Sequence, residues 1–429
     1  MSPLGPSPLM THDRHLSVAQ ARADILAAVR PLEGSETVAL AQALGRVLAA
    51  DLVSPMDVPP HDNSAMDGYA FDGALLAAAA GPLRLRVAGT AYAGAAHTGA
   101  VPPGHGVRVM TGAVMPPGLD TVVPQELASV RAEGGDSWVE VPADAVRRGE
   151  NRRRAGEDLA RGGTAIAGGR VLRPSDLGLA ASLGFDALTV RRRPRVALIS
   201  TGDELREPGQ PLPPGCIYDS NRASLAGALR RLGMEVVDFG LVPDEPAALE
   251  AAFRRAAAQC DAVLTSGGVS VGEADHTRAL LARLGEVAFW KVAMRPGRPF
   301  AFGPLRRPQG QAPSWLFALP GNPVAALVTF YAFVREALLV LAGAPAAPPM
   351  PMQVRSAAAI RKRPGRTEFQ RAIVERDAAG QWVARQTGAQ GAGILRSLSE
   401  ANALLVLPHD QGPVAAGEPV EVWLFDGLV

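Results

Sequence analysis

Apolar and polar residues alternate most regularly between positions 195 and 341. Short apolar runs of the kind that form buried strands occur at 196–200, 236–240, 262–266, 287–290 and 315–319. Between most of them, apolar residues recur at helical spacing, over 221–232, 245–258 and 276–284. Strands that alternate with helices in this way predict a parallel-rich sheet covered by helices on both faces, which is a doubly wound α/β domain.

The rest of the chain has a different pattern on each side of this region. Residues 15–51 show helical spacing twice, the second time at Leu40, Leu44, Val47 and Leu48, so we predict two helices there. Short alternating runs broken by Gly and Pro, such as 83–87 and 106–110, indicate β-rich structure over 53–141 and again after residue 352. Residues 147–186 are mixed, with a helix predicted at 175–183.

These patterns predict a multidomain α/β plus β protein. Its four parts are a mixed α/β linker domain, a β-rich insertion domain, the doubly wound α/β domain and a C-terminal β domain. In that order their predicted ranges are 13–52 with 142–193, 53–141, 194–347 and 348–429.

The longest apolar stretch, 323–344, is predicted to be a buried helix of a soluble protein. It carries Arg335 and Glu336 near its middle, and a charge pair is costly inside the roughly 20-residue span of a membrane helix. The N-terminus lacks a basic region followed by an apolar stretch, and the two cysteines, Cys216 and Cys260, have no metal-binding or redox spacing. We therefore expect a cytoplasmic protein without a membrane partner.

Charge composition argues against nucleic acid as a partner. There are 43 basic and 42 acidic residues, so no global field favours a polyanion. Only two of the basic residues are lysines, and each therefore needs an explanation. Lys362 lies in an Arg-Lys-Arg run and is predicted to be solvated. Lys291 ends an apolar run, where a charge is expected to need a partner, although chance is an equally good explanation from composition alone.

Two predicted strands end in unusual loops, 200–205 and 265–275. Ligands of open parallel sheets bind at the carboxyl ends of the strands. Glu204 and Asp275 place carboxylates there, which suit a hard cation such as Mg²⁺. The turn after the second strand offers backbone N–H groups and hydroxyls to a phosphate, from Ser266, Gly267, Gly268 and Ser270. The alternative is that a glycine-rich turn only reverses the chain. Neither a Walker A sequence nor a Gly-x-Gly-x-x-Gly fingerprint is present.

Two further loops are predicted on the same edge of the sheet. Lys291, Arg295 and Arg298 surround a Pro-Gly turn, an arrangement suited to an oxyanion. The Pro-Gly-Asn-Pro sequence at 320–323 places Pro323 in the first turn of a helix. Taken alone, the latter is better explained as a turn and a helix start.

Polar clusters also occur outside the α/β region. Asp62 and Asp67 lie in a polar stretch at 59–69, and they either face a ligand held elsewhere or satisfy an Asx-rich turn. Thr111 follows a predicted strand, where it is either exposed for hydrogen bonding or, equally well, part of a structural turn. The basic run at 152–154 precedes Glu157 and Asp158; such runs are usually solvated, but a multiply charged ligand needs one.

Taken together and in order, these motifs resemble the molybdopterin molybdenumtransferases related to the gephyrin E domain. The resemblance extends from about residue 15 to the C-terminus. It rests on seven segments: 62–69, 110–113, 156–158, 200–205, 266–275, 296–299 and 319–323.

The resemblance implies an elongated homodimer whose active sites lie between the α/β domain of one subunit and the β-rich insertion of the other. It implies a Mg²⁺-dependent reaction in which adenylylated molybdopterin and molybdate give molybdenum cofactor and AMP. It also implies molybdopterin adenylyltransferase as the upstream partner.

The resemblance assigns roles to individual residues. Asp62 and Thr111 are implied to face the partner's site, and Lys291 to lie near the anionic ligands. Pro320 and Pro323 are implied to shape the loop below the site. The acidic residues implied around metal and substrate are Glu204, Asp244 and Asp275, with Glu204 and Asp275 as metal ligands; Asp158 joins the substrate-binding set.

Two positions depart from the pattern of the family. Arg295 stands where some relatives have lysine, which keeps the charge and changes its geometry. Ala392 replaces a serine that relatives often have in the C-terminal loop, so a hydrogen bond from that side chain is lost.

Two other functions are compatible with parts of this pattern. One is adenylylation of molybdopterin by a smaller relative that consists of the α/β domain, against which the flanking domains argue. The other is a scaffold, as in the receptor-anchoring use of gephyrin, which intact acidic loops make less favourable.

Overall fold

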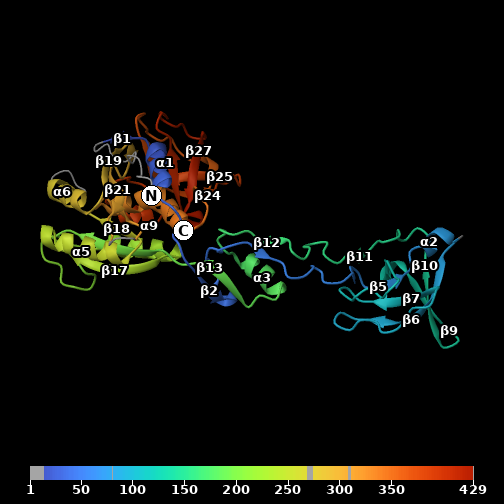
Figure 1. The fold of residues 1–429 in the computed structure, drawn as a ribbon. Coiled ribbons are helices and arrows are strands. Elements are labelled where there is room, and N and C mark those ends of the chain that lie inside the picture. The colour runs from blue at the N-terminus through green and yellow to red at the C-terminus, as the bar shows by residue number, and fades with distance from the viewer. Residues whose placement is uncertain (1–13, 80, 268–273, 308–310, 429) are drawn as a thin grey trace.

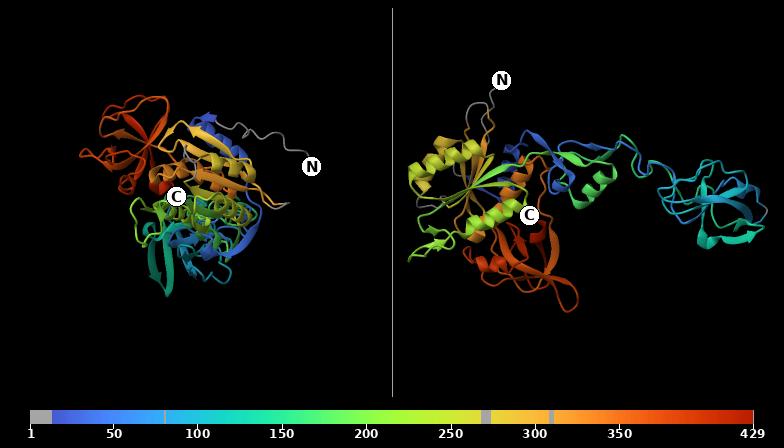
Figure 2. Two further views of the ribbon diagram at one scale, coloured as in Figure 1. Left: turned by 90° about the vertical axis from the view of Figure 1, so that its left-hand side faces the viewer. Right: turned by 90° about the horizontal axis from the view of Figure 1, so that it is seen from below.

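A computed structural model describes residues 14–79, 81–267, 274–307 and 311–428, and the side chains of all of these except 14 and 274–278. The molecule is elongated (Figure 1). The α/β domain and the C-terminal β domain form a large lobe. A narrow connecting region leads from it to a distal β lobe, and the chain crosses this region in both directions. The right-hand view of Figure 2 shows the same arrangement from below.

The α/β domain contains a seven-stranded mixed sheet. Four strands pair with one another in parallel: β17, β14, β18 and β22. Strand β21 is antiparallel to both of its neighbours, β22 and β19, and β1 pairs in parallel with β19. All five predicted strands are present. In sheet order the strands are β1 (Arg14–Leu16), β19 (Ala288–Val292), β21 (Pro299–Leu305), β22 (Ser314–Leu319), β18 (Ala262–Ser266), β14 (Arg195–Thr201) and β17 (Glu235–Val242).

Both faces of this sheet are buried, as the predicted doubly wound architecture requires. Val196 and Leu198 of β14 pack into one core cluster, and the alternate residues Ala197 and Ile199 into another. The first cluster includes helices α1 (Val18–Ala28), α4 (Ser220–Arg231) and α7 (Pro323–Thr329). The second includes α5 (Pro246–Gln259) and α6 (Ala274–Leu284). Although β1 and α1 lie in the range predicted as linker, they pack on the α/β sheet.

The long apolar helix is a core element. It consists of α7, a π-helical turn at Phe330–Val334 and α8 (Arg335–Leu341). It is the one described helix that is long and apolar enough to span a membrane, but 78% of its most apolar window is buried inside the protein. Glu336, which is 2% exposed, accepts a hydrogen bond from Arg22 of α1 at 2.7 Å. The buried helix predicted from its charge pair is therefore confirmed.

The connecting region contains small two-stranded sheets and one helix. The second N-terminal helix predicted from the spacing of Leu40, Leu44, Val47 and Leu48 is wrong. The backbone N–H of Leu48 bonds to Arg170, and Gly45 has a φ of +71°, so strand pairing and a turn replace a helix. The elements are β2 (Ser35–Ala39) with β13 (Ala187–Arg191), β3 (Leu52–Val53) with β12 (Thr164–Ile166), a 3-10 turn (Leu40–Gln42) and α3 (Pro174–Ser182).

The distal lobe is a six-stranded sheet with a small core on each face. The strands predicted at 83–87 and 106–110 are both present. In sheet order they are β8 (Thr121–Pro124), β5 (Gly68–Phe71), β7 (His105–Val109), β6 (Leu83–Ala91), β10 (Asp136–Val141) and β9 (Ser129–Glu133). Shorter elements complete the lobe: β4 (Asn63–Ser64) paired with β11 (Arg152–Arg153), α2 (Leu75–Ala78) and a 3-10 turn (Gln125–Leu127).

The C-terminal domain is a six-stranded sheet closed by pairing between β24 and β26. One of its strands, β20, comes from the α/β segment and fixes this domain against the α/β domain. The strands are β20 (Met294–Arg295), β24 (Thr367–Arg376), β25 (Trp382–Gln386), β23 (Met352–Ser356), β27 (Pro419–Leu424) and β26 (Ala403–Leu407), with α9 (Leu395–Ser399) and a final 3-10 turn (Phe425–Gly427). The predicted second β-rich module is therefore present.

Candidate functional site

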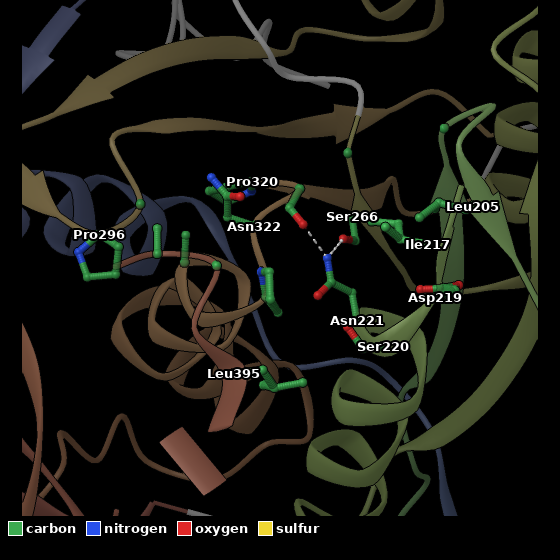
Figure 3. Close-up of a pocket in the computed structure, with 18 of the residues that line it drawn as sticks. Leu205, Ile217, Asp219, Ser220, Asn221, Ser266, Pro296, Pro320, Asn322 and Leu395 are labelled. Atoms are coloured by element: carbon green, nitrogen blue, oxygen red, sulfur yellow. Dashed lines mark hydrogen bonds between the residues drawn. The ribbon is translucent and has the colours of Figure 1, made fainter. Parts of the chain in front are cut away.

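A cavity of about 980 Å³ lies where the carboxyl ends of the α/β strands meet the C-terminal domain. Its walls come from the loops after β14, β18 and β22, the first turn of α4, the Pro-Gly turn before β21 and the loop before α9. The short parallel strands β15 (Leu205–Arg206) and β16 (Ile217–Tyr218) form one side (Figure 3). This position is where ligands bind in open α/β sheets.

Seven of the residues predicted for a site line this cavity. They contribute two carboxylates, a hydroxyl, a glycine turn, a guanidinium and two prolines, although their positions in the sequence extend over more than a hundred residues. The seven are Glu204, Asp244, Ser266, Gly267, Arg295, Pro320 and Pro323.

Glu204 occupies its position because residue 202 is glycine. Gly202 has a φ of +144°, and a Cβ built on it would lie 2.6 Å from the Oε2 atom of Glu204. Any other residue would displace the carboxylate. The neighbouring Asp203 accepts a hydrogen bond from the backbone N–H of Asp244 at 3.3 Å, which holds the two acidic loops together.

The structure brings to the cavity an asparagine that the sequence analysis did not single out. Asn221 lies in the first turn of α4, two residues after the N-cap residue Asp219, and is 9% exposed. Its side-chain nitrogen donates to the hydroxyl of Ser266 and to the carbonyl of Gly321, each at 2.6 Å (Figure 3). The only sequence signal was its place at a predicted helix start. Three segments distant in sequence are joined by this one side chain.

The acceptors available for a metal are carboxylates. Glu204 and Asp244 both line the cavity, and Mg²⁺ is commonly bound by one or two carboxylates together with substrate phosphates and water. Among the described residues, no group of three His, Cys, Asp or Glu side chains is arranged to hold a metal by itself. The donor set therefore fits a hard cation that completes its coordination with ligand oxygens.

Three predicted residues cannot be placed. Gly268 and Ser270 lie outside the described residues, and only the backbone of Asp275 is described, within α6. The predicted pairing of Asp275 with Glu204 as metal ligands therefore stays a prediction.

The basic residues predicted at the Pro-Gly turn separate into two groups. Arg295 lines the cavity, whereas Lys291 and Arg298 are exposed and do not. Gly297 has a φ of +99°, and a Cβ there would lie 2.5 Å from the hydroxyl of Thr329, so this turn requires glycine. The expectation that Lys291 needs a partner is wrong, because its side chain is solvent-exposed.

A fully buried arginine holds the C-terminal loop at the cavity. Arg371 donates to the carbonyls of Gln390 at 3.2 Å, Ala389 at 3.1 Å and Gly391 at 3.0 Å. Burial lowers the pKa of Arg371, with a smaller contribution from Arg295. The loop also includes Ala392, whose carbonyl accepts a hydrogen bond from Val324 at the start of α7.

The remaining predicted residues lie outside the large lobe. Asp62 and Thr111 are in the distal lobe, and Asp158 follows β11 where the chain returns from it (Figure 1). One carboxylate oxygen of Asp67 accepts hydrogen bonds from both the N–H and the hydroxyl of Thr111, each at 2.7 Å. These bonds, the backbone one first, lower the pKa of Asp67. Asp62 accepts from the backbone N–H of Ala155 at 2.8 Å.

Models of three protein families match successive parts of this chain. The MoeA N-terminal region (domain I and II) matches residues 16–184, and the probable molybdopterin binding domain matches 197–340. The MoeA C-terminal region (domain IV) matches 353–425. The three matches together cover both lobes and the connecting region.

Similar proteins match over nearly the whole chain. The molybdopterin molybdenumtransferase of Haemophilus influenzae is 40% identical over 96% of this chain and 100% of its own length. Molybdopterin molybdenumtransferase 2 of Mycobacterium tuberculosis is 39% identical over 94% of this chain and 96% of its own. The crystal structure of the molybdopterin biosynthesis moeA protein from Pyrococcus horikoshii covers 96% of this chain and 100% of its own, with a TM-score of 0.81 and 30% identity. The chain belongs to the molybdopterin molybdenumtransferase family of molybdenum cofactor biosynthesis enzymes.

Proposed function

We propose that this protein is a cytoplasmic, homodimeric molybdopterin molybdenumtransferase that uses Mg²⁺. Its substrates are molybdate and adenylylated molybdopterin, and its products are molybdenum cofactor and AMP. The observation that carries the proposal is the cavity at the carboxyl edge of the sheet, which is lined by the carboxylates Glu204 and Asp244 and by the cation Arg295. A molybdopterin adenylyltransferase would supply the adenylylated substrate.

The cavity offers the groups that two anionic substrates need. Molybdate and a phosphoanhydride repel each other, so bringing them together requires positive charge and hydrogen-bond donors. Arg295 supplies charge, and Ser266 and Gly267 present a hydroxyl and a turn at the end of β18. Bound Mg²⁺ would supply further charge stabilisation between Glu204, Asp244 and the phosphate oxygens.

The protein does not need to contribute a thiolate to molybdenum, because the dithiolene sulfurs of the pterin can take the metal. Cys260 fits this assignment. It lies two residues before β18, at the opposite end of that strand from the cavity, and is fully buried. Burial raises the pKa of Cys260 to about 11, so it remains a thiol at neutral pH.

Asp62, Thr111 and Asp158 enter the proposal through a second copy of the chain. In one chain they lie away from the cavity, whose lining among the described residues runs from Thr201 to Leu395. We propose that the distal lobe of the partner covers the cavity, so that a complete site contains residues of both copies. Lys291 is assigned to the approach of the anionic ligands, since it is exposed on β19.

The direct test is AMP release from adenylylated molybdopterin, measured in Mg²⁺ buffer with and without molybdate. The proposal requires release that depends on both molybdate and Mg²⁺. Tight binding of the adenylate by a folded dimer without release would contradict it and would instead identify a carrier or a scaffold.

A further inference from the structure

The orientation of the Asn221 side chain is fixed by chemistry. A carbonyl oxygen only accepts hydrogen bonds, so the atom 2.6 Å from the carbonyl of Gly321 must be the amide nitrogen. The same nitrogen lies 2.6 Å from the hydroxyl oxygen of Ser266. Because an amide nitrogen does not accept, Ser266 is the acceptor of this bond. Both N–H groups of Asn221 are therefore used.

This arrangement determines what the hydroxyl of Ser266 can do. Its oxygen accepts from Asn221, so its own proton must point in another direction. Among the described residues, the Ser266 hydroxyl makes no second hydrogen bond. Ser266 is the last residue of β18. Both Ser266 and Asn221 line the cavity (Figure 3). The hydroxyl is consequently left as a donor on the wall of a cavity that, under the proposed function, receives a phosphoanhydride.

We propose that Asn221 is a positioning residue that holds the Ser266 hydroxyl as a donor to a phosphate oxygen of the adenylylated substrate. The inference rests on the proposed function. Asn221 acts through Ser266 and does not itself need to touch the substrate. Its second bond, to the carbonyl of Gly321, anchors the Asn221 side chain, so that its other N–H stays directed at Ser266.

The inference predicts how three variants change KM for the adenylylated substrate. Ser266→Ala removes a hydrogen bond to a charged group and should raise KM roughly tenfold to a hundredfold. Asn221→Ala leaves the hydroxyl without orientation and should raise KM by about tenfold. Because Asn221 acts through Ser266, KM of the double variant should be no higher than KM of Ser266→Ala alone. In a double-mutant cycle, this result corresponds to strong coupling between the two residues.

Asn221→Asp supplies the sharper variant, since its side chain has the same shape and cannot donate when ionised. The serine hydroxyl would then donate to the carboxylate and turn its lone pairs toward the anionic ligand. KM should rise more than in Ser266→Ala. A KM equal to or below that of Ser266→Ala would overturn the inference, even if Asn221→Ala does not fold.

Asn402 provides a matched control in the C-terminal domain. It also makes two hydrogen bonds with one side-chain amide, to the N–H and carbonyl of Val374 at 2.7 and 2.9 Å. Asn402→Ala should lower the melting temperature and leave KM unchanged. An equal rise of KM in Asn402→Ala would show that loss of any such amide has this effect, and would overturn the inference.

The cycle also separates this inference from the proposed function. Additive effects of the Asn221 and Ser266 variants, in an enzyme whose wild type releases AMP in a molybdate-dependent way, overturn the role of Asn221 alone. A wild type that releases no AMP overturns the proposed function and the inference with it. Coupled effects in an active wild type support both.

Discussion

The cavity of the α/β domain and the polar edge of the distal lobe both collect carboxylates and hydroxyls, but the surroundings of these groups differ. Two buried polar atoms of residues that line the cavity lack a hydrogen-bond partner among the described residues, the hydroxyl of Thr201 and the side-chain oxygen of Asn221. In the distal lobe, Thr111 is exposed and both of its donors are bonded to Asp67.

This difference indicates two kinds of functional surface. Unpaired buried polar groups are costly, so a cavity that contains them is suited to a ligand that pairs with them. Thr111 is exposed and already donates both of its hydrogen bonds to Asp67, so it does not need a ligand to pair with these donors. Its rigid orientation is useful only when another surface covers it. The two surfaces are complementary halves of one proposed site.

The largest effect on turnover is expected at the cavity. Glu204→Gln removes a negative charge that Mg²⁺ requires, and should lower kcat by about a hundredfold or more. Glu235→Gln is the matched control, because Glu235 pairs with Arg195 at the opposite edge of the same sheet, at 2.9 Å. AMP release under saturating substrate measures both. Equal activity of the two variants would remove Glu204 from the site.

A smaller effect is expected in the distal lobe. Thr111→Ala removes the hydroxyl that Asp67 orients, and should lower molybdate-dependent turnover about tenfold. Thr111→Ser, which keeps the hydroxyl, should retain most of the activity. Unchanged turnover in a folded, dimeric Thr111→Ala protein would mean that this surface does not cover the cavity of the partner.

Asp67→Asn should have a weaker effect than Thr111→Ala. The amide oxygen can still accept one bond from Thr111, but a neutral acceptor holds it less strongly than a carboxylate, so we expect a loss of about threefold to fivefold in turnover. The control is Asp120→Asn in the same lobe. Asp120 accepts from Gly73 at 2.7 Å and from the hydroxyl of Thr121 at 2.8 Å, as part of the lobe's own structure. That variant should lower the melting temperature and leave turnover unchanged.

No effect on turnover is expected from Asp261→Asn. Asp261 is 4% exposed and accepts two hydrogen bonds from Arg192, at 2.7 and 2.9 Å, on the edge of the sheet away from the cavity. Burial raises the pKa of Asp261, but Arg192 and the N–H of Arg195 outweigh it, and the net pKa is lowered. The variant should lose about 2 kcal/mol of stability at neutral pH.

The pH dependence of this loss follows from the lowered pKa of Asp261. A carboxylate with a folded-state pKa below its unfolded value of about 3.9 stabilises the protein above that pH. The contribution disappears as the pH falls through the folded pKa. Denaturant titrations of the wild type and Asp261→Asn should therefore differ at pH 7 and converge below about pH 4. A constant difference would exclude ionised Asp261 as the cause.

The sequence predicted the parallel strands well because each is an apolar run flanked by helical spacing. It did not predict β21 (Pro299–Leu305), the antiparallel strand between β19 and β22. The strand contains Pro299, Gly303 and Pro304, and proline and glycine weaken the sequence signal for a strand. The segment is extended because it pairs with a neighbouring strand on each side. Antiparallel bridges of Val47 with Val171 and of Leu48 with Val190 likewise overrode the helical spacing of residues 40–48.

The two lysines show the limit of reading burial from local sequence. Lys362, predicted to be solvated, is 3% exposed and donates to the carbonyls of Arg363, Arg366 and Gln411 at 3.0, 2.7 and 3.3 Å. Its partner Gln411 comes from a loop about fifty residues away in sequence. Lys291, predicted to need a partner, is exposed. For Lys362, a distant segment decides the environment.

The site residues were predictable where a motif marked them and not otherwise. Glu204, Ser266 and Pro323 lie in recognisable strand-end loops and do reach the cavity. Asn221 was marked only by its place at a predicted helix start, and Arg371 lies inside a strand with no local signal. Their roles come from three-dimensional contacts. Which distal residues meet which cavity depends on a second copy of the chain.

A subunit-mixing experiment tests most directly whether each site is shared between two copies. Chains carrying Thr111→Ala and chains carrying Glu204→Gln are co-expressed with different tags, and the mixed dimer is isolated. If sites are shared, both defects fall in one site and the other is intact, so the mixed dimer should recover about half of wild-type AMP release. If each site lies within one chain, its activity would equal the mean of the two parent homodimers, and that result would contradict the account.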